Sequence, residues 1–201
     1  MTAHSLQPFK DLVSQRCGLS CDGVAEANLV SALALRMKVT ASQSASSYFI
    51  LVSGDEDEFH ELVALLTVNE TYFFREPAQL TLAADILIPR LLSGRADDRP
   101  LRILSAGCST GEEPYSLAMA LREKFGESAG HLVSITAVDI DRQALASACR
   151  AEYGEFSFRV LSPELRDRHF LNKPPNRYLL SDAVRGMSRS MLKLEGRRCS
   201  P

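Results

Sequence analysis

The sequence predicts an α/β protein in which a small N-terminal helical bundle precedes a partial domain with a doubly wound parallel sheet. Three observations support this fold class. Apolar residues recur at helical spacing through the first third of the chain. Residues 101–121 then predict a strand, a glycine-rich turn and a helix. A second apolar run, residues 132–138, ends at an acidic residue and predicts a second strand of a βαβ unit.

The composition is that of a globular protein without a nucleic-acid or membrane signature. The chain has 201 residues, of which 45% are hydrophobic, and a formal net charge of -2. It can therefore bury a core, and it offers no bulk attraction to nucleic acid. It has neither an apolar run of the ~20 residues that a membrane span needs nor a signal peptide layout. The five cysteines are scattered and odd in number, which suits a reducing cytoplasm. We expect a cytoplasmic protein with no membrane insertion and no metal site.

Residues 1–78 are expected to form the helical domain. Phe9, Leu12, Val13 and Cys17 lie at helical spacing, and later stretches repeat this pattern without strands between them. Several short helices of this kind make a compact bundle. The helices are expected at about 9–17, 24–37, 42–51 and 55–67.

The segment 69–75 follows these helices directly. Its three aromatic residues, 72–74, are expected to pack between the two domains. Asn69, Thr71 and Arg75 stand at spacings of two and four. In an extended or turning segment these three polar side chains can face one cleft together.

The glycine-rich turn at residues 105–111 does not have the pattern of a phosphate-binding turn. It lacks G-x-G-x-x-G, and no Gly-Lys-Ser/Thr follows it. Glu112 and Glu113 stand at the helix start, where they would repel a phosphate. A cofactor with cationic or hydroxylated groups fits better, and a nicotinamide oxidoreductase is disfavoured. The alternative is an ordinary strand-to-helix turn.

Asp139 stands at the end of the second predicted strand. An acid at this place in a βαβ unit holds a ribose hydroxyl pair, because a carboxylate can accept from both hydroxyls at once. The alternative is that Asp139 or Asp141 caps the next helix, residues 142–151. Asp141 is the better cap because it directly precedes that helix, which leaves Asp139 for the ribose.

Three motifs, in this order, carry a resemblance to a known family. They are Asn-Glu-Thr-Tyr-Phe-Phe-Arg at 69–75, Ser-Thr-Gly-Glu-Glu-Pro-Tyr-Ser at 109–116, and Asp-Ile-Asp at 139–141. Over residues 9–170, roughly, the chain resembles the chemotaxis receptor methyltransferases of the CheR type. These are S-adenosylmethionine-dependent protein-glutamate O-methyltransferases. The resemblance implies a Rossmann-like methyltransferase domain after the bundle, with S-adenosylhomocysteine as product and the cytoplasmic domain of methyl-accepting chemotaxis receptors as partner.

The resemblance also implies which residues form the site. Arg75 would be the catalytic residue, orienting the acceptor carboxylate by a bidentate contact. Asp139 would hold the ribose, and Glu113 would lie near the cationic end of the cofactor or its hydroxyls. The full set expected to bind the cofactor is Asn69, Thr71, Arg75, Ala106, Gly107, Glu113 and Asp139.

In the family, the helical domain helps to hold the receptor through a basic helix face. Here the basic residues are few: Lys10 and Arg16 on the first predicted helix, Arg36 and Lys38 near the end of the second. Solvated surface charge is the alternative reading for each of them.

Residues 79–201 are expected to form a methyltransferase domain that is incomplete at its C-terminus. Residues 80–92 predict a helix and 93–100 a linker loop. We expect a small β subdomain at about 153–195, in which 177–180 and 191–194 form a hairpin. Only two strands of the doubly wound sheet are then present. The helix at 114–121 and the first strand should each expose an apolar face. A catalytically impaired fragment that binds the receptor or the cofactor is therefore the alternative function.

Overall fold

The computed structural model describes residues 3–192, which form two compact units. The first unit contains the chain up to Val68 together with Ile140–Arg142, and the second contains the remainder. The division after Val68 falls earlier than the boundary expected at residue 78, because Phe73 packs in the core of the second unit. Every helix in the described part of the chain is too short or too polar to span a membrane.

The first unit is all-helical, as the sequence predicts. Ser44 begins one helix through a capping box with Ser47, and the Asp55 carboxylate begins the next by accepting from the amides of Asp57 and Glu58. Apolar side chains from all the helices of this unit share one core. The helices are α1 (Ala3–Cys17), α2 (Val24–Val39), α3 (Ala45–Gly54) and α4 (Glu56–Ala64).

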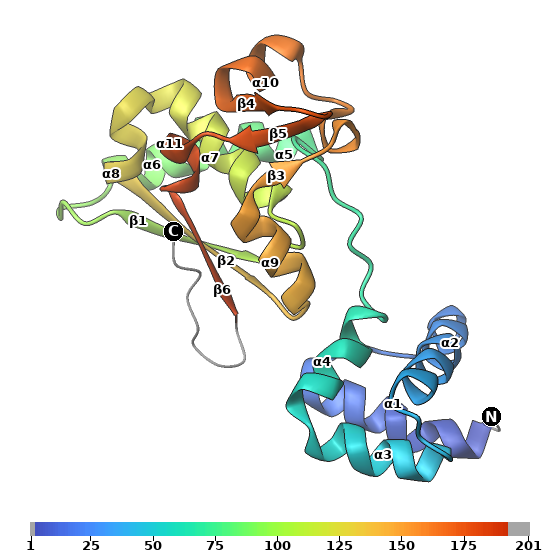
Figure 1. The fold of residues 1–201 in the computed structure, drawn as a ribbon. Coiled ribbons are helices and arrows are strands. Elements are labelled where there is room, and N and C mark those ends of the chain that lie inside the picture. The colour runs from blue at the N-terminus through green and yellow to red at the C-terminus, as the bar shows by residue number, and fades with distance from the viewer. Residues whose placement is uncertain (1–2, 193–201) are drawn as a thin grey trace. The chain divides into compact units, whose positions relative to one another are not determined.

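The second unit contains a parallel sheet with the strand order β1-β2-β6 (Figure 1). Ala106 lies opposite Val138, and Asp139 lies opposite Leu192, so the carboxyl ends of the strands meet at one edge. The α/β fold class and the first two strands are confirmed. The strands are β1 (Leu101–Ala106), β2 (Val133–Asp139) and β6 (Ser188–Leu192), and the helices that follow the first two are α7 (Glu112–Phe125) and α9 (Arg142–Arg150).

A second, antiparallel sheet has the order β3-β5-β4. The predicted hairpin of 177–180 with 191–194 is wrong. Residues 177–180 pair with β3 and β4, whereas β6 extends the parallel sheet beside β2. Short apolar runs do not encode their pairing partner, and residues 193 and 194 lie outside the described residues. The elements of this region are β3 (Glu152–Tyr153), η3 (Glu155–Phe158), α10 (Pro163–His169), β4 (Phe170–Lys173), β5 (Arg177–Leu180) and α11 (Asp182–Arg185).

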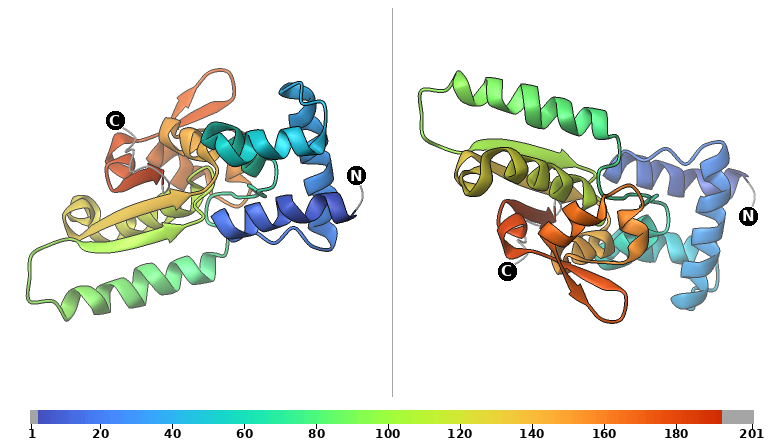
Figure 2. Two further views of the ribbon diagram at one scale, coloured as in Figure 1. Left: turned by 90° about the horizontal axis from the view of Figure 1, so that it is seen from below. Right: turned by 90° about the horizontal axis from the view of Figure 1, so that it is seen from above.

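The helix predicted at 80–92 is one continuous helical rod in Figure 2. It begins at Pro77, a residue suited to the first helical position. The rod consists of α5 (Pro77–Thr81), the π-helical segment η1 (Leu82–Leu87) and α6 (Ile88–Ser93). Two further short helices, η2 (Gly126–Ser128) and α8 (Ala129–Leu132), lie between α7 and β2 in the sequence.

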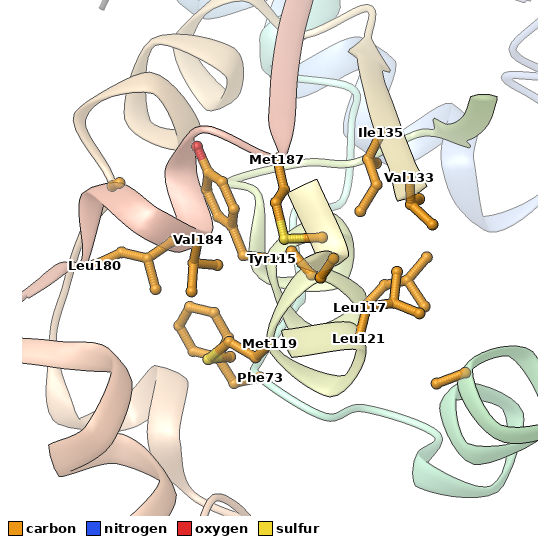
Figure 3. Close-up of a cluster of buried hydrophobic side chains, with 14 of the residues drawn as sticks. Phe73, Tyr115, Leu117, Met119, Leu121, Val133, Ile135, Leu180, Val184 and Met187 are labelled. Atoms are coloured by element: carbon orange, nitrogen blue, oxygen red, sulfur yellow. The ribbon is translucent and has the colours of Figure 1, made fainter. Parts of the chain in front are cut away.

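Helix α7 lies in the middle of the core of the second unit (Figure 3). Met119 and Leu121 are fully buried, and Leu117 is 9% exposed. The prediction of an exposed apolar face on 114–121 is therefore wrong, because Phe73 and α11 belong to the cluster that covers this helix. The first strand does expose an apolar side chain: Leu104 is 65% exposed.

Candidate functional site

The turn from β1 to α7 is fastened to the end of β2. The amides of Gly107 and Cys108 both donate to the Val138 carbonyl, over 2.8 and 3.1 Å. Gly107 has a φ of 77°, and a Cβ built on it would meet no heavy atom within 4 Å. The glycine therefore adopts a left-handed conformation at low cost and leaves open space in front of its backbone, as close approach of a ligand requires.

Gly111, at the other end of the turn, is required for packing. Its φ is 96°, and a Cβ there would lie 2.9 Å from the Cβ of Ala148 and 3.1 Å from the Tyr153 hydroxyl. Helix α7 begins directly after it, at Glu112. The two positions thus require glycine for different physical reasons: Gly107 faces open space, whereas Gly111 faces a packed core.

Three carboxylates surround this turn, and uncharged groups donate to each of them. Glu113 is exposed and accepts from the Ser105 hydroxyl at 2.6 Å. Asp139 is half-buried and accepts from the Ser109 amide at 2.6 Å. Glu112 is 3% exposed and accepts from Thr110 and Ser157 hydroxyls at 2.5 and 3.0 Å. Within residues 3–192, neither Glu112 nor Glu113 forms an ion pair. The hydroxyl donors therefore orient Glu112 and Glu113 without cancelling their charge.

The 69–75 segment is tied to the turn by side chains. The Ser109 hydroxyl donates to Asn69 Oδ1 at 3.1 Å, so Ser109 contacts both Asn69 and Asp139. The Phe74 amide donates to the Ser116 hydroxyl at 2.9 Å, and Ser116 is fully buried in α7. The Phe73 amide donates to the Ser157 carbonyl at 2.9 Å. Three serines, Ser109, Ser116 and Ser157, therefore fix the loop from several directions.

Phe73 itself anchors the loop in the second unit. Its ring is fully buried and stacks on Phe158 with centroids 5.4 Å apart, and it meets Tyr153 and Phe170 edge-on at 4.7 and 5.0 Å. Such aromatic pairs contribute about 0.5–1.5 kcal/mol beyond their buried area. The prediction that the aromatic residues pack between the two domains is wrong for Phe73, because its ring packs inside the second unit.

Arg75 lies between two residues with strained backbones. Phe74 and Glu76 have φ of 57° and 55°, an uncommon conformation for residues other than glycine. The exposed Arg75 side chain donates from Nη1 to the Glu70 carbonyl at 2.6 Å. Conformations of this kind cost of order 1–3 kcal/mol each and cluster at functional sites. The backbone at this arginine is thus held in place by the surrounding contacts.

The structure brings some of the predicted site residues together and leaves others apart. Asn69, Gly107 and Asp139 gather around Ser109, with Ala106 as the last residue of β1. Glu113 joins them through Ser105 on β1. Arg75 makes its described hydrogen bond to Glu70 instead, and no described hydrogen bond places Thr71 against the group.

A cavity of about 370 Å³ lies elsewhere in the second unit. Helices α5, α7 and α10 and the segment η1 contribute its lining, for example Leu80, Lys124 and Leu165. None of the predicted site residues lines it. It is therefore separate from the strand ends that carry the candidate site.

Sequence reasoning missed the serines that hold the site together. Ser109 lies in the glycine-rich turn at 105–111, directly after the first strand. Its place at the end of that strand is a signal that could have identified it. Ser116 lies inside α7, and its hydroxyl also donates to the Glu112 carbonyl at 2.5 Å. Ser157 lies far along the chain in η3. No pattern in the sequence points to the last of these contacts.

The chemistry of the turn excludes a reactive thiol. Cys108 is buried, and burial followed by the nearby Asp139 carboxylate raises the pKa of its thiol to about 12. It stays protonated at neutral pH and is inert as a nucleophile. Among the described residues, no group of three or more His, Cys, Asp and Glu is placed to hold a metal ion.

Comparison with protein families gives matches over both units. Residues 4–67 match the all-alpha domain of CheR methyltransferases, and residues 69–191 match the SAM binding domain of CheR methyltransferases. The second match covers more than half of the chain.

Individual relatives agree with these matches. The chain is 36% identical over 177 residues to the probable biofilm formation methyltransferase WspC of Pseudomonas aeruginosa. This match covers 88% of the chain and 41% of that relative. It is 31% identical over 182 residues to chemotaxis protein methyltransferase 2 of Vibrio cholerae and to chemotaxis protein methyltransferase 1 of Pseudomonas aeruginosa. Those matches cover 88% of the chain and 62% and 66% of the relatives, so the chain spans less than two thirds of the length of each. These names give no support to the alternative of a binding module.

Proposed function

Because the chain belongs to the CheR methyltransferase family, with an all-alpha domain and an S-adenosylmethionine-binding domain, we propose that it methylates glutamate side chains. The acceptor is the cytoplasmic domain of a methyl-accepting chemotaxis receptor, and the protein acts in the cytoplasm. One observation supports this proposal above the others. Two carboxylates, Glu113 and Asp139, flank an open left-handed glycine where β1 and β2 end, and the Ser105 hydroxyl and the Ser109 amide donate to them.

The donor set fits S-adenosylmethionine. Asp139 uses one carboxylate oxygen for the Ser109 amide, and a carboxylate has about four acceptor positions, so it can also accept from the ribose hydroxyls. Glu113 favours a positive charge nearby, which suits the cationic end of the cofactor. Gly107 lets the ligand approach the backbone. When bound, the cofactor supplies an electrophilic methyl group on a sulfonium.

The acceptor needs alignment more than it needs a base. A glutamate side chain has a free pKa of ~4.3 and is ionised at neutral pH. Arg75 can orient that carboxylate with two parallel hydrogen bonds. Positioning of two reactants in this way can supply ~7–11 kcal/mol of the barrier. Asn69 and Thr71 belong to the same loop and are assigned to the cofactor side.

Calorimetry with S-adenosylhomocysteine tests the ribose assignment. Asp139→Asn keeps an oxygen that can accept from the Ser109 amide but removes the charge, and we expect affinity to fall at least about tenfold, because hydrogen bonds to charged groups contribute about 1.5–3 kcal/mol. Asp182→Asn, an exposed acid on α11, is the control and should bind like the wild type. Equal affinities of the two variants would refute the assignment. Radiolabelled methyl transfer to a receptor cytoplasmic fragment tests the activity itself.

A further inference from the structure

A second arginine lies beside the loop that carries Arg75. The Arg159 guanidinium carbon is 3.5 Å from the centroid of the Tyr72 ring and 4.1 Å from that of Phe156. Arg75 approaches the same Tyr72 ring, at 5.9 Å. Two cations thus share one tyrosine, although their residues are far apart in the sequence.

The hydrogen-bonding groups of Arg159 are poorly used. Nη1 reaches the Phe156 carbonyl and Nη2 reaches the Glu70 carboxylate, each only at 3.4 Å, near the limit for a hydrogen bond. The Glu70 side chain is 66% exposed, and an exposed pair of this kind contributes little. Within the described residues Arg159 has no closer acceptor. Its planar fork is therefore pre-organised by the two rings and available to a carboxylate from outside.

The surroundings of Arg159 suit a peptide that is both acidic and apolar. Phe156 is 70% exposed and Val160 is 56% exposed, which is high for large apolar side chains. Phe156 stands three residues before Arg159 in the sequence, and Val160 directly follows it. A carboxylate on Arg159 would bring the apolar side chains of the same peptide onto these two residues.

We propose that Arg159, held against the Tyr72 and Phe156 rings, is a docking residue for the acidic protein segment that carries the acceptor glutamate. It binds a carboxylate of that segment other than the one being methylated, because the proposed function assigns Arg75 to the acceptor itself. Glu70 occupies Arg159 weakly until the substrate displaces it. This inference rests on the proposed function, since it names how the same reaction selects an acidic acceptor.

The test separates acceptor binding from cofactor binding. Arg159→Ala should raise the KM for a receptor cytoplasmic fragment about tenfold, as expected for the loss of one charge-assisted contact. The Kd for S-adenosylhomocysteine should stay within about twofold under the same arithmetic. Arg159→Lys keeps the charge without the fork and should restore the KM only partly. Arg166→Ala is the matched control, because Arg166 also lies over a tyrosine, at 4.8 Å from Tyr178, outside the loop.

A binding readout that needs no turnover completes the test. Fluorescence anisotropy would follow a labelled amphipathic peptide with glutamates on its polar face, and the same peptide with glutamines. The wild type should prefer the glutamate peptide and Arg159→Ala should not, with circular dichroism showing both proteins folded. An unchanged KM and peptide preference in Arg159→Ala would overturn the inference, as would a parallel loss of S-adenosylhomocysteine affinity, which indicates a supporting role for the loop. A wild type that binds S-adenosylhomocysteine but methylates no receptor fragment would instead refute the proposed function and this inference with it.

Discussion

A buried carboxylate of the helical unit and the carboxylates at the strand ends of the second unit have opposite kinds of hydrogen-bond donor. In the helical unit, Arg36 forms a bidentate pair with Glu58 at 2.9 and 2.5 Å, and Tyr48 donates to the same carboxylate at 2.7 Å. At the strand ends of the second unit, Glu112 and Glu113 receive only hydroxyl donors among the described residues. An ion pair cancels the field of a charge, whereas a neutral donor orients the charge and leaves the field in place. The comparison teaches which charges stabilise the fold and which are kept for a ligand.

The same contrast bears on the basic face expected to hold the receptor. Lys10 pairs with Asp22 and Glu26, and Arg16 pairs with Glu56. Together with Arg36, three of the four basic residues singled out are therefore neutralised inside the unit. Only Lys38 is exposed without a described partner. This weakens the expectation that positive charge on this unit holds a receptor, and it gives more weight to the docking role proposed for Arg159 on the second unit.

The largest expected effect separates the two glycines of the turn. Gly111→Ala places a Cβ 2.9 Å from Ala148 at a φ of 96°, so we expect a loss of about 3 kcal/mol or more in unfolding free energy. Gly107→Ala faces open space at a φ of 77°, and its cost should be about 1–2 kcal/mol of backbone strain. Urea denaturation measures both. In Gly107→Ala, the loss of binding free energy for the cofactor should exceed the loss of unfolding free energy. Equal stabilities of the two variants would contradict the packing role of Gly111.

The next effect tests the comparison directly with two isosteric changes. Glu58→Gln breaks the charge pair with the largely buried Arg36, and we expect a loss of about 2 kcal/mol in stability with unchanged S-adenosylhomocysteine binding. Glu113→Gln should leave the urea midpoint nearly unchanged and lower that affinity about tenfold. We therefore expect Glu58→Gln to show its defect in denaturation alone and Glu113→Gln to show its defect in calorimetry alone. A binding defect in Glu58→Gln, or a large stability loss in Glu113→Gln, would end the distinction.

The smallest effect is on the pH dependence of stability. Burial acts to raise the pKa of Glu58, but hydrogen bonds from Arg36 and Tyr48 together outweigh it and hold that pKa below its ordinary value of 4.5. A depressed carboxyl pKa contributes stability that is present above the unfolded pKa and is lost as pH falls through the folded pKa. Denaturation between pH 5 and pH 3 should thus show a steeper decline for the wild type than for Glu58→Gln. Parallel curves would show that this pair does not couple stability to pH.

Several parts of the fold were predictable because their signals are local. The apolar runs at the start of 101–121 and at 132–138 place β1 and β2, the helical spacing that follows the turn places α7, and the motif order identifies the family. The cofactor roles of Asn69, Thr71, Arg75 and Asp139 stay predictions, although three serines now give a physical reason for how their loop and turn are held.

By itself, the sequence determined the α/β class, the helical first unit, the strand–turn–helix of the second unit and the acids at its strand ends. Each of these features depends on residues that are neighbours along the chain. Only the tertiary structure decided that Ser188–Leu192 joins β2, that Ser157 and Ser116 hold the 69–75 loop, and that Arg159 lies on Tyr72. The reason is physical: these contacts join residues tens of positions apart. Their partners are chosen by the way the whole chain packs, and no spacing within one segment records that choice.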